Sequence, residues 1–349
     1  MAAITGSDTV VGLKLGSTFG TAVAIGAGDV FYCEGISKNE STTELTTQSI
    51  GAGTVMTTQS DKGFTTTSVP INGYAGYEDS RLAGLGQLFG TDTVTDNGDT
   101  SYTHAFTVNE TFNAKYATIA HQVFNAGTFE YPSCSATSVT FSTDSVPNYV
   151  TQDQEFLADE KVINSSTNTY ATLASASVDK NELVVCQQAS EFLINLQGGG
   201  ALSKTTDLVS ITGFTFTLNR PQESPSEIKG SAGNGEPVST GVPMDATFSI
   251  TLRKLEDMTY FTAFDAGTEY KASLGIVGGE ITTGVDYAWT LSIPRMKIVQ
   301  SPDFNVSDAG NNPLTVNFKV LVASANPTGM GSTYPFLEVT NEQTAAYIS

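Results

Sequence analysis

The side chains that most often carry catalysis are few in this chain and widely spaced. It has two histidines, His104 and His121, and three cysteines, Cys33, Cys134 and Cys186. A catalytic triad needs a nucleophile, a base and an orienting acid, and structural zinc needs clustered Cys and His. Neither pattern is present. We therefore expect reduced, buried thiols of a cytosolic protein, histidines that at most join a buried polar pair, and no cofactor or metal.

One group of carboxylates has the residue type of a calcium site but not its spacing. Asp92, Asp96 and Asp99 surround an Asn-Gly turn, and this spacing differs from that of an EF-hand loop. An Asp-Asn-Gly-Asp sequence between two alternating segments is typical of a β-hairpin, which is the interpretation we prefer. The glycine-rich segments 84–86 and 198–200 also lack the context of nucleotide-binding loops. These observations predict that the protein is not an enzyme.

The composition points to a folded, sparsely charged protein. The 349 residues include 16 Lys or Arg and 36 Asp or Glu, so the formal net charge is −20, yet only 15% of residues are charged. The average is about 25%. Binding to nucleic acid needs an excess of Lys and Arg, which is absent, and a disordered acidic tail would not contain 19 Phe and 13 Tyr. No signal peptide or membrane-spanning helix is expected.

Alternating segments dominate the chain and predict a mainly β fold. Apolar and polar residues, the latter mostly Thr and Ser, alternate over residues 214–219, 247–252, 289–293 and 316–320, which gives strands with one buried and one polar face. The single tryptophan, Trp289, is expected in the core. Two other segments, 77–89 and 255–266, have apolar residues at helical spacing and end at glycine. Each is predicted to be a short helix that lies on a sheet.

Two long stretches, 38–63 and 220–241, are poor in apolar residues and are expected to be long loops between strands. Loops of this length are uncommon unless they are functional. The two stretches also belong to an internal repeat. Gly35 aligns with Gly213 and Tyr77 with Leu255, at one constant offset (213 − 35 and 255 − 77, both 178). The order strand, long loop, strand, helix, strands thus occurs twice, and a duplicated chain is expected to fill two equivalent positions of a symmetric assembly.

Several segments together resemble one known family, the tail tube proteins of bacteriophages with long non-contractile tails, in their larger two-domain form. The opening Leu-Lys-Leu-Gly-Ser-Thr-Phe-Gly-Thr-Ala-Val-Ala is similar to the start of such proteins, and Tyr-Thr-His-Ala-Phe-Thr resembles one of their strands. The resemblance covers most of the chain and lies in residues 13–24, 102–107, 191–219, 246–252 and 287–294.

The resemblance implies a fold and an assembly. Each domain would be a tail-tube-like β-sandwich or β-barrel with a short flanking helix, here residues 1–175 and 176–325, followed by a C-terminal extension, 326–349. Sheets of neighbouring copies would join into a barrel whose bore passes DNA, and one long loop per domain would reach the next ring. The charged residues of these loops are the candidate inter-ring contacts: Glu40, Glu44, Asp61, Lys62, Arg220, Glu223, Glu227, Lys229 and Glu236.

The partners follow from the same resemblance. A two-domain chain would form a homotrimeric ring with pseudo-sixfold symmetry, although a hexamer is also compatible. Tape measure, tail terminator and distal tail proteins would be its partners in the virion tail, after synthesis in the bacterial cytoplasm. DNA would pass through the bore during genome ejection without specific binding, because an acidic or hydroxyl-lined surface does not attract phosphates.

Two alternatives remain open at this point. One is a virion or cell-surface β-sandwich that binds a capsid or a glycan, as a decoration or adhesin subunit does. The other is a polysaccharide depolymerase, which would need a cleft with two carboxylates about 5 to 10 Å apart.

Overall fold

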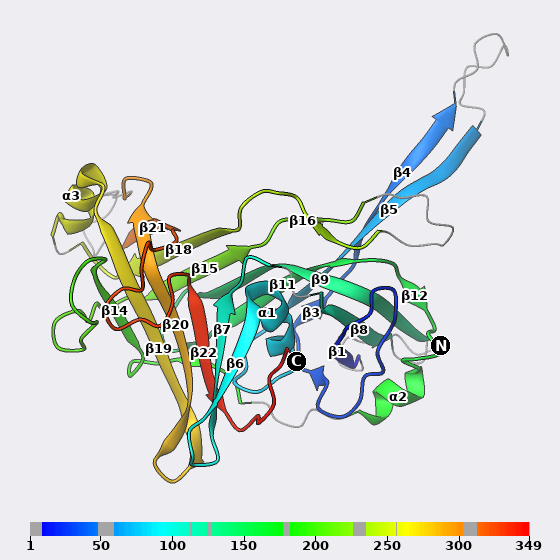
Figure 1. Cartoon of the computed structure of the whole chain (residues 1–349), viewed down its shortest axis with the longest axis horizontal. Helices are drawn as coiled ribbons and strands as arrows, with labels where there is room; N and C mark the ends of the chain where they lie inside the picture. Colours follow the sequence, from blue (N-terminus) through cyan, green and yellow to red (C-terminus); the bar gives the residue numbers. More distant parts are fainter. Residues whose placement is uncertain are drawn as a thin grey trace.

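The computed structural model describes residues 9–47, 59–111, 114–123, 127–176, 182–225, 235–255, 257–302 and 313–348. The predicted mainly β fold is confirmed: strands dominate and helices are few and short (Figure 1). None of the helices in the described part of the chain is long and apolar enough to cross a membrane. The strands are β1 (Val11–Gly16), β2 (Val30–Phe31), β3 (Gly35–Ile36), β4 (Asn39–Thr47), β5 (Gln59–Asn72), β6 (Gly90–Asp96), β7 (Tyr102–Val108), β8 (Tyr116–Val123), β9 (Gly127–Thr143), β10 (Asn148–Tyr149), β11 (Thr151–Ala158), β12 (Val162–Ile163), β13 (Val185–Cys186), β14 (Glu191–Leu196), β15 (Gly213–Asn219), β16 (Gln222–Glu223), β17 (Val238–Ser239), β18 (Asp245–Leu252), β19 (Glu269–Thr282), β20 (Val285–Ile298), β21 (Leu314–Val320) and β22 (Phe336–Asn341), and the helices are α1 (Arg81–Phe89), α2 (Tyr170–Ser175) and α3 (Thr259–Ala266).

One antiparallel sheet, which we call the front sheet, runs through the whole molecule. Its strands follow the order β3, β5, β11, β9, β15, β18, β21, β20. The central joint is the pairing of β9 with β15, in which Phe141 lies opposite Phe216 and Ser138 opposite Asn219. Strands from both halves of the chain therefore form a single sheet across residue 175, where we expected a domain boundary.

Two smaller sheets lie behind the front sheet. The first contains β1, β8 and the beginning of β9, with β2 and β12 at its sides. The second contains β14, β19 and the beginning of β20 and continues through β22 and β7 to β6. Because β9 and β20 are long, each passes from a back sheet into the front sheet. The C-terminal segment, expected as an extension, places β22 between β20 and β7 inside this second back sheet.

The two halves of the chain repeat the same topology. In each half a front strand is followed by a helix, and the helices begin 178 residues apart, at Arg81 and Thr259 (259 − 81). Both helices end at a glycine in the left-handed region, Gly90 with φ 106° and Gly267 with φ 64°, where a side chain would be strained. The β6–β7 hairpin, closed by the predicted Asp-Asn-Gly-Asp turn, is extra in the first half.

The core lies between the front and back sheets. Trp289 of β20 is fully buried, as expected, and meets Phe141 of β9 edge to face at 5.3 Å between ring centroids. The alternation predicted for β15 is observed, with Phe214, Phe216 and Leu218 all buried. Each such side chain contributes roughly 1.5–3 kcal/mol by burial. The core thus contains residues of both halves of the chain.

Candidate assembly site

In the described part of the stretch 38–63, expected to be a long loop, residues 39–47 and 59–63 pair as the antiparallel strands β4 and β5, which project from the body (Figure 1). We call residues 38–66 the first arm. Its Thr-rich strands suit a ladder, and Thr42 faces Thr65 at 3.0 Å between their hydroxyl oxygens. At its base, Glu40 binds Lys161 at 2.7 Å and Lys38 at 2.6 Å. Hydrogen bonds from Lys161 and Lys38 hold the pKa of the Glu40 carboxyl below its usual value. This clamp ties the base of the arm to the segment between β11 and β12.

Beyond this clamp, the first arm has no core beneath it. Residues 41–47 and 59–66 pair only with each other among the strands that the structure describes. Leu45 is 57% exposed, and Glu44, which accepts a hydrogen bond from the Ser60 hydroxyl, is also exposed. A two-stranded hairpin alone in water is marginally stable, and its open edges invite another strand or surface. The first arm therefore has the properties of a segment that another molecule covers.

The second stretch begins with a buried anchor. Arg220, predicted to be an exposed contact of the loop, is only 7% exposed. Its guanidinium donates to the carbonyl of Leu88 at 3.0 Å and to that of Glu110 at 3.4 Å. Leu88 lies in the last turn of α1, where carbonyls are unpaired and the helix dipole favours a cation. Arg220 therefore holds the base of the stretch in place and is not available for contact with another ring.

We call residues 220–244 the second arm, and its described part lies on the first half of the same chain. The Ser135 hydroxyl donates to the side-chain oxygen of Gln222, and the Tyr116 hydroxyl donates to the carboxylate of Glu236. Gln222 and Ser239 pair in the short β16–β17 ladder. This arm is thus folded back over β8 and β9, whereas the first arm extends freely (Figure 1).

The predicted contact residues fall into three groups. The first arm carries Glu40, Glu44, Asp61 and Lys62, with Glu40 held in the basal clamp and Asp61 opposite Leu45. In the second arm, Glu223 is exposed, while Arg220 and Glu236 are bonded to the first half. Glu227 and Lys229 lie outside the described residues. Sequence patterns located both arms but did not reveal that only the first one is free.

The outward face of the front sheet is covered by hydroxyl side chains. Many of these pair across strands, as do Thr140 with Thr217 at 3.1 Å and Thr251 with Thr315 at 3.4 Å between oxygens. The Ser, Thr and Asn residues of this face are Ser68, Ser138, Thr140, Ser142, Thr215, Thr217, Asn219, Thr247, Ser249, Thr251, Thr315 and Asn317. The strand alternation predicted such a face. The pairing of β9 with β15, which makes the face continuous, could not be predicted from local sequence.

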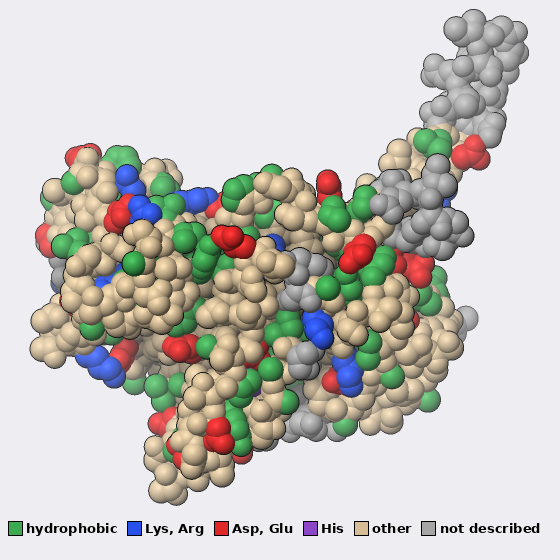
Figure 2. All heavy atoms as spheres, viewed as in Figure 1, with side chains coloured by type: hydrophobic (Ala, Val, Ile, Leu, Met, Phe, Trp, Pro, Cys, Tyr) green, Lys and Arg blue, Asp and Glu red, His purple; other side chains and the backbone are tan. Residues whose placement is uncertain are grey.

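Charge on this face is low and of mixed sign. Asp153 and Glu155 come from β11, and Asp245 forms an ion pair with Lys319. Burial raises the pKa of the Asp153 carboxyl. The face therefore offers few fixed cations for a phosphate to bind. Figure 2 shows acidic and basic side chains scattered over the visible side of the molecule, among hydrophobic side chains and the uncharged remainder of the surface.

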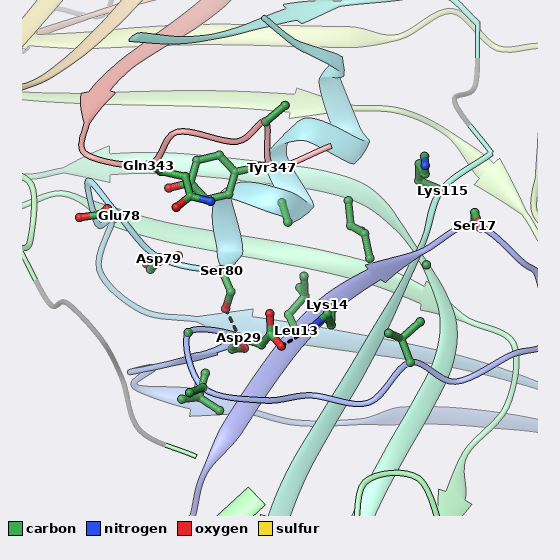
Figure 3. A pocket seen from close by; sticks show the side chains of 18 of the residues that line it. Leu13, Lys14, Ser17, Asp29, Glu78, Asp79, Ser80, Lys115, Gln343 and Tyr347 are labelled. Carbon is green, nitrogen blue, oxygen red and sulfur yellow. Dashed lines mark hydrogen bonds and ion pairs between the residues drawn. The ribbon is translucent and has the colours of Figure 1, made fainter. Parts of the chain in front are cut away.

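A polar pocket of about 800 Å³ lies between β1, the start of α1 and the C-terminal segment (Figure 3). Its charged groups already have partners: Lys14 binds Asp29 at 2.8 Å, and Asp79 binds Arg81 at 2.7 Å. The Ser80 hydroxyl donates to the backbone carbonyl of Asp29 at 2.9 Å, so its proton is directed at a neutral acceptor and not at a base. The pocket joins segments distant in sequence, and the hydrogen bond of Ser80 does not activate it as a nucleophile.

His104 belongs to a buried polar pair, the role that the sequence allowed for the histidines. Its Nδ1 lies 3.1 Å from Asp92, and its Nε2 lies 2.8 Å from the carbonyl of Gln343. Asp92 therefore points inward, whereas Asp96 and Asp99 accept backbone N–H groups within the β6–β7 turn. Among the described residues, no group of three His, Cys, Asp or Glu side chains is arranged to hold a metal ion. All three cysteines are free thiols, and two of them are buried.

Comparisons with known proteins add no relationship to this picture. No protein-family model matches the chain, and no curated protein matches it significantly.

Proposed function

We propose that the protein is the repeating subunit of a phage-type tail tube, a structural protein that assembles into stacked rings. The observation that carries this proposal is the construction of the front sheet. Its first four strands, β3, β5, β11 and β9, and its last four, β15, β18, β21 and β20, follow the same order. Two equivalent units are thus joined side by side through β9 and β15, and the same joint can be repeated between chains.

The ends of the front sheet support such a repeat. At one end, β3 pairs with β5 and has no strand on its other side among the described residues. At the other end, the pairing of β20 with β19 ends where Lys297 lies opposite Glu269, and β20 continues to Ile298. The segment after β20 could pair with β3 of the next copy in the same way that β9 pairs with β15. Such a joint connects two different surfaces of the chain, and its repetition around an axis generates a ring. Closure also removes the exposed edges that would otherwise aggregate.

Three chains of two units each give six equivalent positions, which is the trimeric, pseudo-sixfold ring implied by the resemblance. The front sheet would line the bore, because it is the sheet to which both units contribute equally. Its hydroxyl face and the net charge of −20 suit a conduit that double-stranded DNA crosses without binding. The partners in this proposal are further copies of the chain and the tape measure, terminator and distal tail proteins of a virion tail.

A matched pair of substitutions tests the role of the first arm. Leu45 in this arm and Leu196, the last residue of β14, are 57% and 53% exposed, so replacing either with serine should leave the fold intact. We expect Leu45→Ser to raise the protein concentration needed for assembly, measured by sedimentation velocity, and Leu196→Ser to leave it unchanged. Wild-type protein that sediments as a monomer at every concentration would refute the proposed function. A wild-type assembly unaffected by Leu45→Ser would refute only the role of the arm.

A further inference from the structure

We infer that the first arm of one copy lies on the second half of the neighbouring copy, and that Glu44 there forms an ion pair with Lys297. The inference rests on the proposed function, because it concerns contacts within an assembly of identical chains. It comes from a contact that the chain already makes internally. The second arm lies on the first half through Gln222 and Ser135, and we call the surface around Ser135 the seat of this arm. Because the topology is duplicated, the first arm is equivalent to the second arm, and the second half carries an equivalent seat.

The two arms are equivalent by strand register. Gly35 and Ile36 lie opposite Asn72 and Ile71, and Gly213 and Phe214 occupy the same places opposite Thr251 and Ile250. Nine residues after each of these glycines, the first arm reaches Glu44 in β4 and the second arm reaches Gln222 in β16. The side chain at the position of Gln222, which binds the first half, is therefore the exposed carboxylate of Glu44 in the first arm.

The two seats are equivalent by the same reasoning. In the first half, Ser68 of β5 lies opposite Leu157, which lies opposite Ser135 of β9. In the second half, Thr247 of β18 lies opposite Lys319, which lies opposite Lys297 of β20. Ser68 and Thr247 are themselves equivalent, since each is three residues before the isoleucine that faces β3 or β15. The position of Ser135 in the first half is therefore that of Lys297 in the second.

The seat in the second half is open where the seat in the first half is covered. All nine residues of α1 are buried, whereas only Ala263 of α3 is buried. Val299, just beyond β20, is 58% exposed. Lys297 lies opposite Glu269, and a hydrogen bond from Arg295 together with the charges of Arg295 and Lys297 lowers the pKa of the Glu269 carboxyl. Glu269 forms its ion pair with Arg295, and none is formed by Lys297 with the described residues. A Gln–Ser contact within the chain thus corresponds to a Glu–Lys contact between chains. Opposite charges at this place favour the correct neighbour and register more than they add affinity.

Charge reversal tests the pair directly. Glu44→Lys and Lys297→Glu should each raise the concentration needed for assembly about tenfold, because each places like charges together. The double variant, with both charges exchanged, should return to within twofold of the wild type. Asp286→Lys, an exposed reversal on the β19–β20 hairpin, is the matched control and should have no effect. Circular dichroism checks that each variant is folded.

A second measurement identifies the contact without mutation. A carbodiimide joins a carboxylate to an amine at zero length, so assembled wild-type protein should give a Glu44–Lys297 cross-linked peptide. Mixing ¹⁴N- and ¹⁵N-labelled chains shows that the link is between copies. Assembly of both single variants at the wild-type concentration, or failure of the folded double variant to recover, would overturn the pair while leaving the proposed function standing. A wild-type protein that never assembles would overturn both.

Discussion

Arg220 provides the sharpest test of how the second arm is attached. Its guanidinium is buried and donates to the carbonyl of Leu88 at 3.0 Å, at the end of α1, and more weakly to that of Glu110. Replacement by methionine keeps most of the apolar stem but removes these donors and leaves the Leu88 carbonyl without its cation.

The expected cost follows from these contacts. A hydrogen bond to a charged donor contributes about 1.5–3 kcal/mol, and a cation at a helix C-terminus about 0.3–1 kcal/mol more. We therefore expect Arg220→Met to lower the free energy of unfolding by about 2–4 kcal/mol. Arg220→Lys keeps the charge but not the two-pronged geometry, and should lose roughly half as much.

Urea unfolding, followed by the fluorescence of the buried Trp289 in dilute protein, measures this loss. With a slope of about 3 kcal/mol/M, a loss of 3 kcal/mol shifts the midpoint by about 1 M. Arg253→Met is the matched control, because Arg253 is exposed and its loss should stay within about 0.5 kcal/mol. If Arg220→Met also stays within that range, Arg220 does not anchor the second arm and the reasoning from its contacts fails.

Two further predictions concern acid sensitivity and the bore. Burial, aided by the charge of Lys38, lowers the pKa of His121 to about 4. In the unfolded chain the same imidazole binds a proton near pH 6.5. The free energy of unfolding that is present above pH 6.5 therefore falls by about 2 kcal/mol between pH 6.5 and 5, where only the unfolded chain is protonated. Urea midpoints at pH 7 and pH 5 should show this loss in the wild type and not in His121→Gln, and an equal loss in both proteins would contradict the assignment. On the front face, Thr140→Lys combined with Thr217→Lys should make assembled protein retain double-stranded DNA on a filter at 50 mM salt and release it at 200 mM. Retention that stays at the wild-type level would argue against this face lining the bore.

Much of the fold could be predicted from local sequence, because its signals are local. The alternation of residues 214–219 and the apolar spacing of α1 and α3 each depend on neighbouring residues, and all three elements are observed. The constant offset of 178 residues also anticipated equivalent helices. What local patterns could not reveal was pairing at long range: β9 with β15 and β22 with β7 join segments whose sequences carry no mark of their partner.

The candidate site divides in the same way. Both arms could be located in the sequence because they contain few apolar residues. A segment that covers no core has no buried positions for apolar side chains to fill. The fate of each arm depends on tertiary contacts. Arg220 and Glu44 are both charged residues in polar stretches. Arg220 is buried and binds a carbonyl at the end of α1, whereas Glu44 remains exposed. Composition does not distinguish a charged residue that is buried at the end of a helix from one that faces solvent.

The central claim is that identical chains join through their front sheets into a ring of six equivalent units. Cryo-electron microscopy of the concentrated protein tests it most directly. We expect rings or stacked tubes with three chains per ring, threefold symmetry that approximates sixfold, and the hydroxyl face of the front sheet toward the bore. Single particles of one chain at high concentration, or rings whose bore is lined by another surface, would contradict it.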